Sequence, residues 1–213
     1  MADIEVIEVI AGERRRVAEL AETLTEEQLL TRSLCEAWSV RDVLAHLLMP
    51  LVTSRAAATA TIVRARGDLD RANVMLTSRL AGMSVQEIAD GLRRHANHPF
   101  RPPGMSLAAP LTDLLVHTQD MTRPLGLAHR PPPEGVAAAL SFLTRGAPRG
   151  FVRRGATDGL SLHATDLDRD WGSGKAVSGR GIDLVLALTG RTSALALLEG
   201  PGVDVLGRRL RPS

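Results

Sequence analysis

Aromatic side chains are scarce in this sequence of 213 residues, which contains no tyrosine, two tryptophans and three phenylalanines. Proteins that bind single strands of nucleic acid stack bases on aromatic side chains, so this scarcity argues against such a partner. The charges argue the same way, because 26 basic residues are balanced by 24 acidic ones and the formal net charge is only +2. The one basic run, Arg14 to Arg16, is typical of a solvated helix face. We therefore expect no nucleic-acid partner.

Cysteine is also nearly absent, since Cys35 is the single one. An intrachain disulfide and a thiolate-rich zinc site are thereby excluded, and a reducing, cytoplasmic compartment is expected. No stretch reaches the roughly 18 uninterrupted apolar residues of a membrane span. The acidic N-terminal segment lacks the basic and apolar regions of a signal peptide. These absences predict a cytoplasmic protein without a membrane partner. The sequence does not decide between a monomer and a homodimer.

Apolar residues, by contrast, make up 44% of the chain, which is enough for a packed core. Helical periodicity dominates the first two thirds and predicts helices over 3–22, 39–66, 72–81, 84–98, 110–121 and 134–144. The helix from Ser39 should kink at Pro50, because proline cannot donate to the carbonyl of His46. The first helix should turn an apolar stripe inwards and leave Arg14 on the solvated side.

The pattern changes after Gly146, where a segment rich in Gly and Arg precedes an alternation of apolar and polar residues. This alternation predicts a strand over 160–164 and a return strand over 171–177, followed by a short buried helix over 182–188. The sequence is thus interpreted as mainly α, with an up-down helical bundle over residues 1–147 and a small α+β domain over 150–213.

One predicted helix, 110–121, carries the most informative constellation. Asp113 and His117 are four residues apart and Asp120 follows three residues later, so the three side chains share one face. A carboxylate and an imidazole at this spacing can hold one divalent ion, although such a pair is more commonly solvated. An ion would need a third ligand, and His46, in a strongly apolar helix, is the best candidate, because an unpartnered buried imidazole is costly.

Three segments together resemble a known family: Cys35–Leu47 with Trp38 and His46, the stretch from Asp113 to His117, and Asp120–Gly126. They are similar to the mycothiol-dependent maleylpyruvate isomerase family, part of the DinB-like group of metal-binding four-helix bundles. The segment Gly179–Arg191 resembles the sterol-carrier-like C-terminal domain of that family. The resemblance implies a DinB-like four-helix bundle followed by a small α+β domain.

The resemblance also implies a ligand set, because the family binds a divalent metal, usually Zn²⁺, through a histidine and a Glu-x-x-x-His pair. These positions fall on His46, Asp113 and His117, with aspartate in place of the usual glutamate. Three ligands leave an open coordination position, as in catalytic zinc sites. In the family, mycothiol occupies such a position and attacks a small electrophilic substrate.

Two further residues near this helix are candidate catalytic residues. Asp120 would orient a ligand histidine, or else be a surface acid at the helix end. Arg123 would hold an anionic substrate or the cofactor, or else complement the helix dipole. Cys35 would be a reactive thiol, or else an inert one. The arginines of the small domain, Arg153, Arg154 and Arg191, would add cationic contacts to an anionic substrate.

Three functions remain open from the sequence. The first is a mycothiol-dependent transferase or isomerase in which the metal holds the thiol cofactor as thiolate. The second is a metal-dependent hydrolase that uses zinc-bound water. The third is a non-catalytic protein that binds a metal or a ligand.

Overall fold

Two compact units share the chain in the computed structural model, which describes residues 3–35, 38–80, 82–146 and 148–211. The bundle unit contains the chain up to Pro102 together with His117–His129, and the sheet unit contains Pro103–Val116 together with the chain from Arg130 onwards. The division between the two units therefore falls inside one helix, between Val116 and His117. The predicted boundary between residues 147 and 150 stays a prediction.

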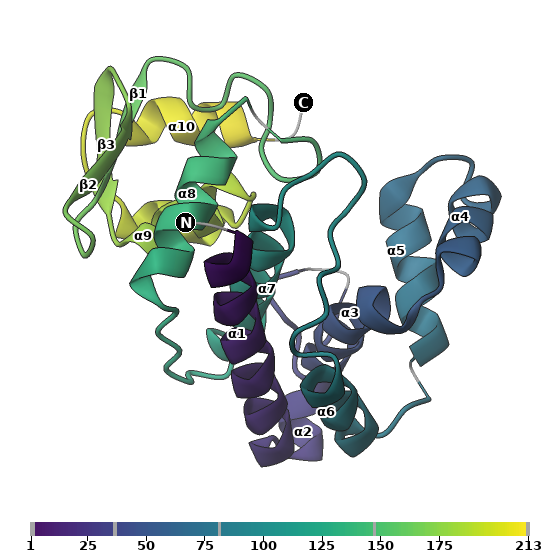
Figure 1. The fold of residues 1–213 in the computed structure, drawn as a ribbon. Coiled ribbons are helices and arrows are strands. Elements are labelled where there is room, and N and C mark those ends of the chain that lie inside the picture. Colours follow the sequence, from purple (N-terminus) through teal and green to yellow (C-terminus); the bar gives the residue numbers. More distant parts are fainter. Residues whose placement is uncertain (1–2, 36–37, 81, 147, 212–213) are drawn as a thin grey trace. The chain divides into compact units, whose positions relative to one another are not determined.

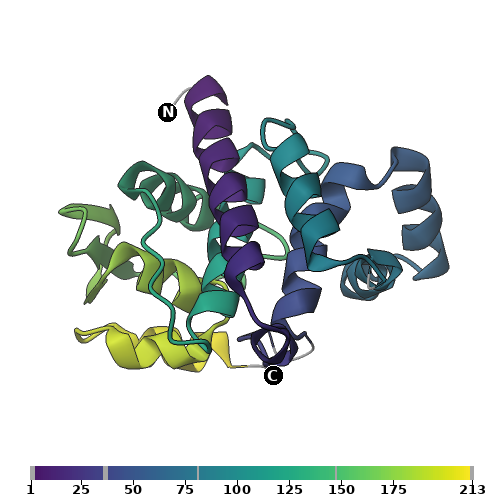
Figure 2. The same ribbon diagram turned by 90° about the horizontal axis from the view of Figure 1, so that it is seen from below.

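The bundle unit is helical throughout. Its elements are α1 (Asp3–Thr23), α2 (Glu26–Leu30), α3 (Val40–Val52), α4 (Arg55–Arg64), α5 (Leu69–Thr77), the 3₁₀ turn η1 (Ser78–Leu80), α6 (Val85–Arg94) and the second half of α7 (Ala108–Thr122). Helix α1 packs against α6 and α6 against α3, and the pair α1 and α6 is visible in Figures 1 and 2. In the described residues, no helix is both long enough and apolar enough to cross a bilayer.

Local sequence signals place the starts of three of these helices. Thr25, Ser39 and Ser84 each accept a bond from the backbone three residues on, and the side chain at that position bonds back to the cap. Each box satisfies two backbone N–H groups that a helix start would otherwise leave without partners. These capping boxes account for the positions at which α2, α3 and α6 begin.

The predicted single helix over 39–66 is wrong, because the structure divides it into α3 and α4. Helix α3 ends at Val52, two residues after Pro50, and Thr53 takes an extended conformation. Ser54 then caps α4 by accepting a bond from the Ala57 backbone. Proline weakens the last turn of α3, and the new cap at Ser54 begins a separate helix.

Arg14 is buried rather than solvated, which corrects the prediction for α1. Only 4% of the residue is exposed, and its Nη1 donates to the carbonyls of His95, Ala96 and His98 at distances of 2.8–3.1 Å. These carbonyls follow the end of α6, where a helix leaves acceptors unsatisfied. Burial lowers the pKa of Arg14 to about 10, so the guanidinium stays charged at neutral pH and joins α1 to α6.

The sheet unit combines a three-stranded sheet with short helices. Besides the first half of α7, its elements are α8 (Pro133–Thr144), β1 (Leu160–Ala164), β2 (Arg169–Gly172), β3 (Lys175–Gly179), α9 (Gly181–Leu188), the 3₁₀ turn η2 (Thr192–Leu197) and α10 (Val203–Leu210). The strand order is β2-β1-β3, and α8 and α9 pack against the strands (Figure 1). Mainly helical structure with a small α+β part is thus confirmed.

The predicted single return strand over 171–177 is wrong, because the structure forms two strands there, β2 and β3. Strand β2 pairs antiparallel with β1, with Leu162 opposite Trp171, and β3 pairs parallel with the other edge of β1. The chain crosses the start of β1 at Gly174, where φ is 126° and a Cβ would lie 2.1 Å from the Gly159 carbonyl oxygen. Only glycine fits there, and the crossing allows one short segment to supply both neighbours of β1.

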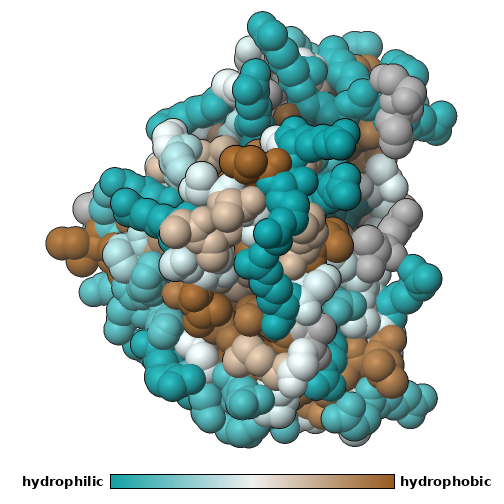
Figure 3. Space-filling view, turned by 90° about the vertical axis from the view of Figure 1, so that its right-hand side faces the viewer, coloured by the Kyte–Doolittle hydropathy of each residue, from teal (hydrophilic) through white to brown (hydrophobic). Residues whose placement is uncertain are grey.

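The surface carries several large apolar side chains, four of them on α4 and α5. Ile62, Val63, Leu69 and Val74 are between 36% and 72% exposed. Figure 3 shows the side of the molecule that faces right in Figure 1, where brown apolar residues lie among teal hydrophilic ones. Exposed apolar side chains are ordinary on the surface of a folded protein.

Candidate metal centre

The candidate ligands on α7 share a helix that begins earlier than predicted. It starts at Ala108, so Pro110 is the third helical residue rather than the first. Proline is tolerated there because the first backbone N–H groups of a helix have no intrahelical acceptor. Leu111, Leu115 and Met121 are completely buried. This packing fixes the face from which Asp113 and His117 project.

His46, Asp113 and His117 come together in space. Each offers one ligand atom, and the three atoms lie within 4.8 Å of one another. Both histidines are buried and Asp113 is half-buried, while the two imidazole centroids are 4.8 Å apart. The structure therefore brings His46 to Asp113 and His117, which lie 67 and 71 positions further along the sequence. Their role as metal ligands stays a prediction.

Asp120 contacts the imidazole of His117 on the same helix. Its Oδ2 is 2.9 Å from Nδ1 of His117, and the residue is completely buried. A carboxylate at this position accepts the Nδ1 proton, so the imidazole lone pair is on Nε2, the nitrogen that can bind a cation. The alternative interpretation of Asp120 as a surface acid is wrong, because the residue has no exposed surface.

Trp38 is a neighbour of both histidines that sequence reasoning placed in a motif but gave no role. Its ring centroid is 4.5 Å from that of His46 and 5.8 Å from that of His117. The residue directly precedes Ser39, the cap of α3, and is half-buried. The three rings form a triangle of mutual contacts.

Arg123 belongs to a chain of hydrogen bonds that includes three residues without a predicted role, Gln119, His129 and Glu13. Its Nε donates to Oε1 of Gln119 at 2.9 Å, and the Gln119 amide contacts Nδ1 of His129 at 3.0 Å. Nε2 of His129 is 3.0 Å from Oε2 of Glu13, which is completely buried and also pairs with Arg16. Glu13 lies between Ile10 and Val17 on the buried stripe of α1, a spacing that identifies it as inward-facing.

Arg191, Arg153 and Cys35 are other candidates from the sequence, and each takes part in a hydrogen bond that involves a backbone carbonyl. Arg191 donates to the Thr189 carbonyl at 2.8 Å, and Arg153 donates to the Arg211 carbonyl. The Cys35 carbonyl accepts the Trp38 backbone N–H at 2.8 Å. A role for these residues toward a substrate stays a prediction.

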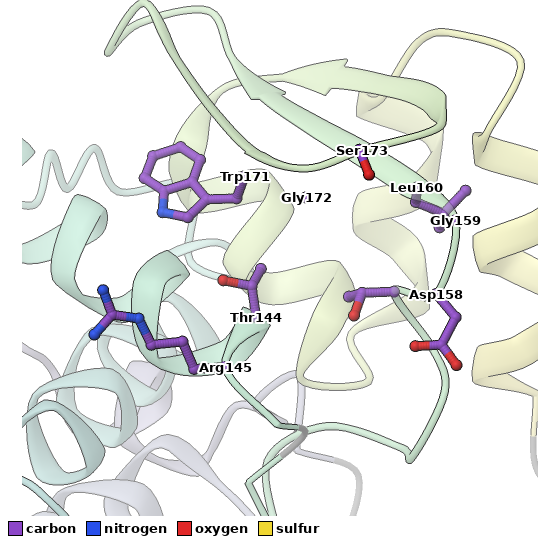
Figure 4. Close-up of a pocket in the computed structure, with 9 residues that line it drawn as sticks. Thr144, Arg145, Asp158, Gly159, Leu160, Trp171, Gly172 and Ser173 are labelled. Atoms are coloured by element: carbon purple, nitrogen blue, oxygen red, sulfur yellow. The ribbon is translucent and has the colours of Figure 1, made fainter.

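The sheet unit contains a separate hollow of about 450 Å³ (Figure 4). It is lined by Thr144, Arg145, Thr157, Asp158, Gly159, Leu160, Trp171, Gly172 and Ser173. Arg145, Asp158, Gly159, Gly172 and Ser173 are exposed. The hollow includes none of the candidate ligands, and its mixture of isolated charges and hydroxyls does not converge on one chemistry.

The donor set on α3 and α7 fits a divalent transition metal. Two imidazoles and one carboxylate are ligands that Zn²⁺ accepts in catalytic sites, where three protein ligands leave one position for another molecule. The supporting carboxylate of Asp120 matches the arrangement in which a metal-bound histidine donates its other ring N–H.

Comparisons with known proteins show which family and which fold the chain resembles. Residues 10–98 match the family described as the mycothiol maleylpyruvate isomerase N-terminal domain, a range that includes Trp38 and His46 but ends before α7. A crystal structure of a mutant of the mycothiol-dependent maleylpyruvate isomerase is similar over 94% of this chain and 93% of that one. The TM-score is 0.57 at 12% identity, which shows a shared fold. Among curated proteins, none matches this sequence significantly.

Proposed function

We propose that this chain, whose residues 10–98 match the mycothiol maleylpyruvate isomerase N-terminal domain, is a metal-dependent enzyme. It would use a small external thiol either to isomerise a small electrophilic substrate or to transfer the thiol to it. The observation that carries the proposal is the convergence of His46, Asp113 and His117 within 4.8 Å. The similarity of fold over nearly the whole chain to an enzyme of that name adds to it.

The side chains at the site would have two different roles, binding the ion and orienting one of its ligands. His46, Asp113 and His117 would hold the ion, and Asp120 keeps the proton of His117 on Nδ1, away from the nitrogen that would bind. When bound, such an ion would supply a Lewis acid that keeps a sulfur ligand deprotonated near neutral pH. Zn²⁺ is the proposed ion, because it accepts this mixture of ligands without redox chemistry.

The thiol would come from outside the chain. Cys35 is the only cysteine, and its exposure is intermediate. A single fixed cysteine cannot be an exchangeable cofactor, whereas a small thiol such as mycothiol can enter, react and leave. Arg123, one turn beyond Asp120, would contact the anionic group of the substrate or of the thiol, because guanidinium groups bind carboxylates in paired geometry.

Metal content and turnover of purified variants test this function. We expect about one divalent ion per wild-type chain, and loss of metal in each of the variants His46→Ala, Asp113→Ala and His117→Ala. His95→Ala, which removes a histidine outside the site, is the matched control and should keep its metal. The wild type should isomerise maleylpyruvate, or conjugate another electrophile, only when mycothiol is present. Turnover without thiol, or full metal in the His117→Ala variant, would refute the proposal.

A further inference from the structure

We propose that Trp38 is a positioning residue, whose indole fixes the ring planes of His46 and His117 and thereby sets the geometry and affinity of the metal centre. This inference rests on the proposed metal site and names a residue to which neither the sequence motif nor the ligand geometry gives a role. It starts from three rings that touch one another, with centroid separations of 4.5, 5.8 and 4.8 Å.

The ring contacts restrict rotation of the imidazole planes of His46 and His117. The indole is tilted by 40° to the imidazole of His46 and by 39° to that of His117, and the two imidazoles meet edge to face at 71°. An imidazole has a broad, roughly two-fold torsion about its Cβ–Cγ bond, so its plane must be set by neighbours. Rotation of either imidazole would push against the indole or the other imidazole.

The backbone of Trp38 is itself held firmly. Its carbonyl accepts bonds from the backbone N–H of Ser33 at 3.0 Å and from the hydroxyl of Ser33 at 2.8 Å. Its own N–H donates to the Cys35 carbonyl, and the next residue, Ser39, caps α3. Both backbone polar groups of Trp38 are thus hydrogen-bonded, and the residue is directly followed by the cap of α3.

The segment that contains Trp38 is tied to the helix that carries the other ligands. The Leu34 N–H donates to the Asp120 carbonyl at 3.0 Å, and the Asp120 carboxylate contacts His117. Val40, the first residue of α3, donates to the Thr31 carbonyl at 2.9 Å. The segment that holds Trp38 therefore joins the start of α3 to α7, from which His46 and His117 come.

An indole would also attract imidazoles that a bound metal ion polarises. The face of the indole is negative, and it attracts a positively polarised ring more strongly than an aliphatic side chain would. Residues that support metal ligands without touching the ion typically change metal affinity by about 10- to 100-fold when replaced. We expect a change at the lower end of this range for Trp38, because its contacts are ring contacts rather than hydrogen bonds.

The test compares Trp38→Leu and Trp38→Phe with Trp171→Phe, which alters the only other tryptophan and leaves the site intact. Cobalt is substituted for the native metal, and its dissociation constant and visible absorption spectrum are measured. Trp38→Leu should raise the dissociation constant about tenfold and shift the absorption bands. Trp38→Phe should lie between Trp38→Leu and the wild type, while Trp171→Phe should match the wild type.

The outcomes separate positioning from simple structural support. A folded Trp38→Leu variant with lower stability, but with the wild-type dissociation constant and spectrum, would overturn the inference. If Trp38→Leu does not fold, an unchanged dissociation constant and spectrum in Trp38→Phe would overturn it equally. If the wild type binds no cobalt at all, the proposed function fails by itself. In that case NMR relaxation of the imidazole carbons in metal-free protein decides: faster ring motion in the Trp38 variants supports the inference, and unchanged motion overturns it.

Discussion

Removal of the Asp120 carboxylate should weaken metal binding by an amount that the structure allows us to estimate. The carboxylate is completely buried and lies 2.9 Å from Nδ1 of His117. A hydrogen bond that involves a charged group contributes about 1.5–3 kcal/mol, which corresponds to roughly 10- to 100-fold in a dissociation constant. Asp120→Asn keeps the size and loses the charge, so we expect about a tenfold loss. Asp120→Ala removes the acceptor and should approach a hundredfold.

The assay is competition for Zn²⁺ against a chelator of known affinity, with calorimetry of the metal-free variants to show that they fold. Asp90→Asn, which removes an exposed carboxylate on α6, is the matched control and should bind zinc as the wild type does. Wild-type zinc affinity in Asp120→Ala would refute the role of Asp120. The same result would weaken the assignment of His117 as a ligand.

Three further predictions concern stability and domain structure. Arg14→Met should lower the free energy of unfolding by about 3 kcal/mol, because it leaves three carbonyls near the end of α6 without their donor, whereas Arg15→Met on the exposed side should change it by less than about 0.5 kcal/mol in urea titrations. The hydrogen bond from Arg93 lowers the pKa of Glu22 to about 2, so the stabilisation from this carboxylate should be complete above pH 4.5 and lost as the pH falls towards 2. The difference in melting temperature between the wild type and Glu22→Gln should shrink over this window, and a constant difference would contradict the pairing. Limited proteolysis should cut between residues 144 and 159, and cuts confined to the middle of the bundle would count against the predicted domain boundary.

The sequence predicts those parts of the fold that depend on residues close together in the chain. The capping boxes at Thr25, Ser39 and Ser84 place helix starts, because a side chain and a backbone group three residues apart are enough to form them. The end of α3 near Pro50 was not accessible in the same way. Proline signals a disturbance, but whether a helix kinks or ends depends on the cap that follows and on packing.

Non-local pairing explains the other differences. The alternation of apolar residues predicts a strand after β1, but the assignment of β2 and β3 to opposite edges depends on the glycine crossing at Gly174. The prediction of a solvated Arg14 fails because it follows the charge of the side chain rather than its position on the apolar stripe. The acceptors of Arg14 lie more than 80 residues away. Helical spacing predicts that Asp113 and His117 form a pair. The apolar surroundings of His46 make it only a candidate third ligand, and the resemblance to a family strengthens that prediction.

The most direct test of the central claim is the absorption spectrum of the cobalt-substituted protein during titration with mycothiol. If His46, Asp113 and His117 hold an ion with a position open to an external thiol, a sulfur-to-cobalt charge-transfer band should grow and saturate as thiol is added. The band should be absent from the His46→Ala protein and present in His95→Ala. A wild-type protein that binds cobalt but develops no such band at millimolar mycothiol, and releases no heat on mixing, would contradict the thiol-dependent function.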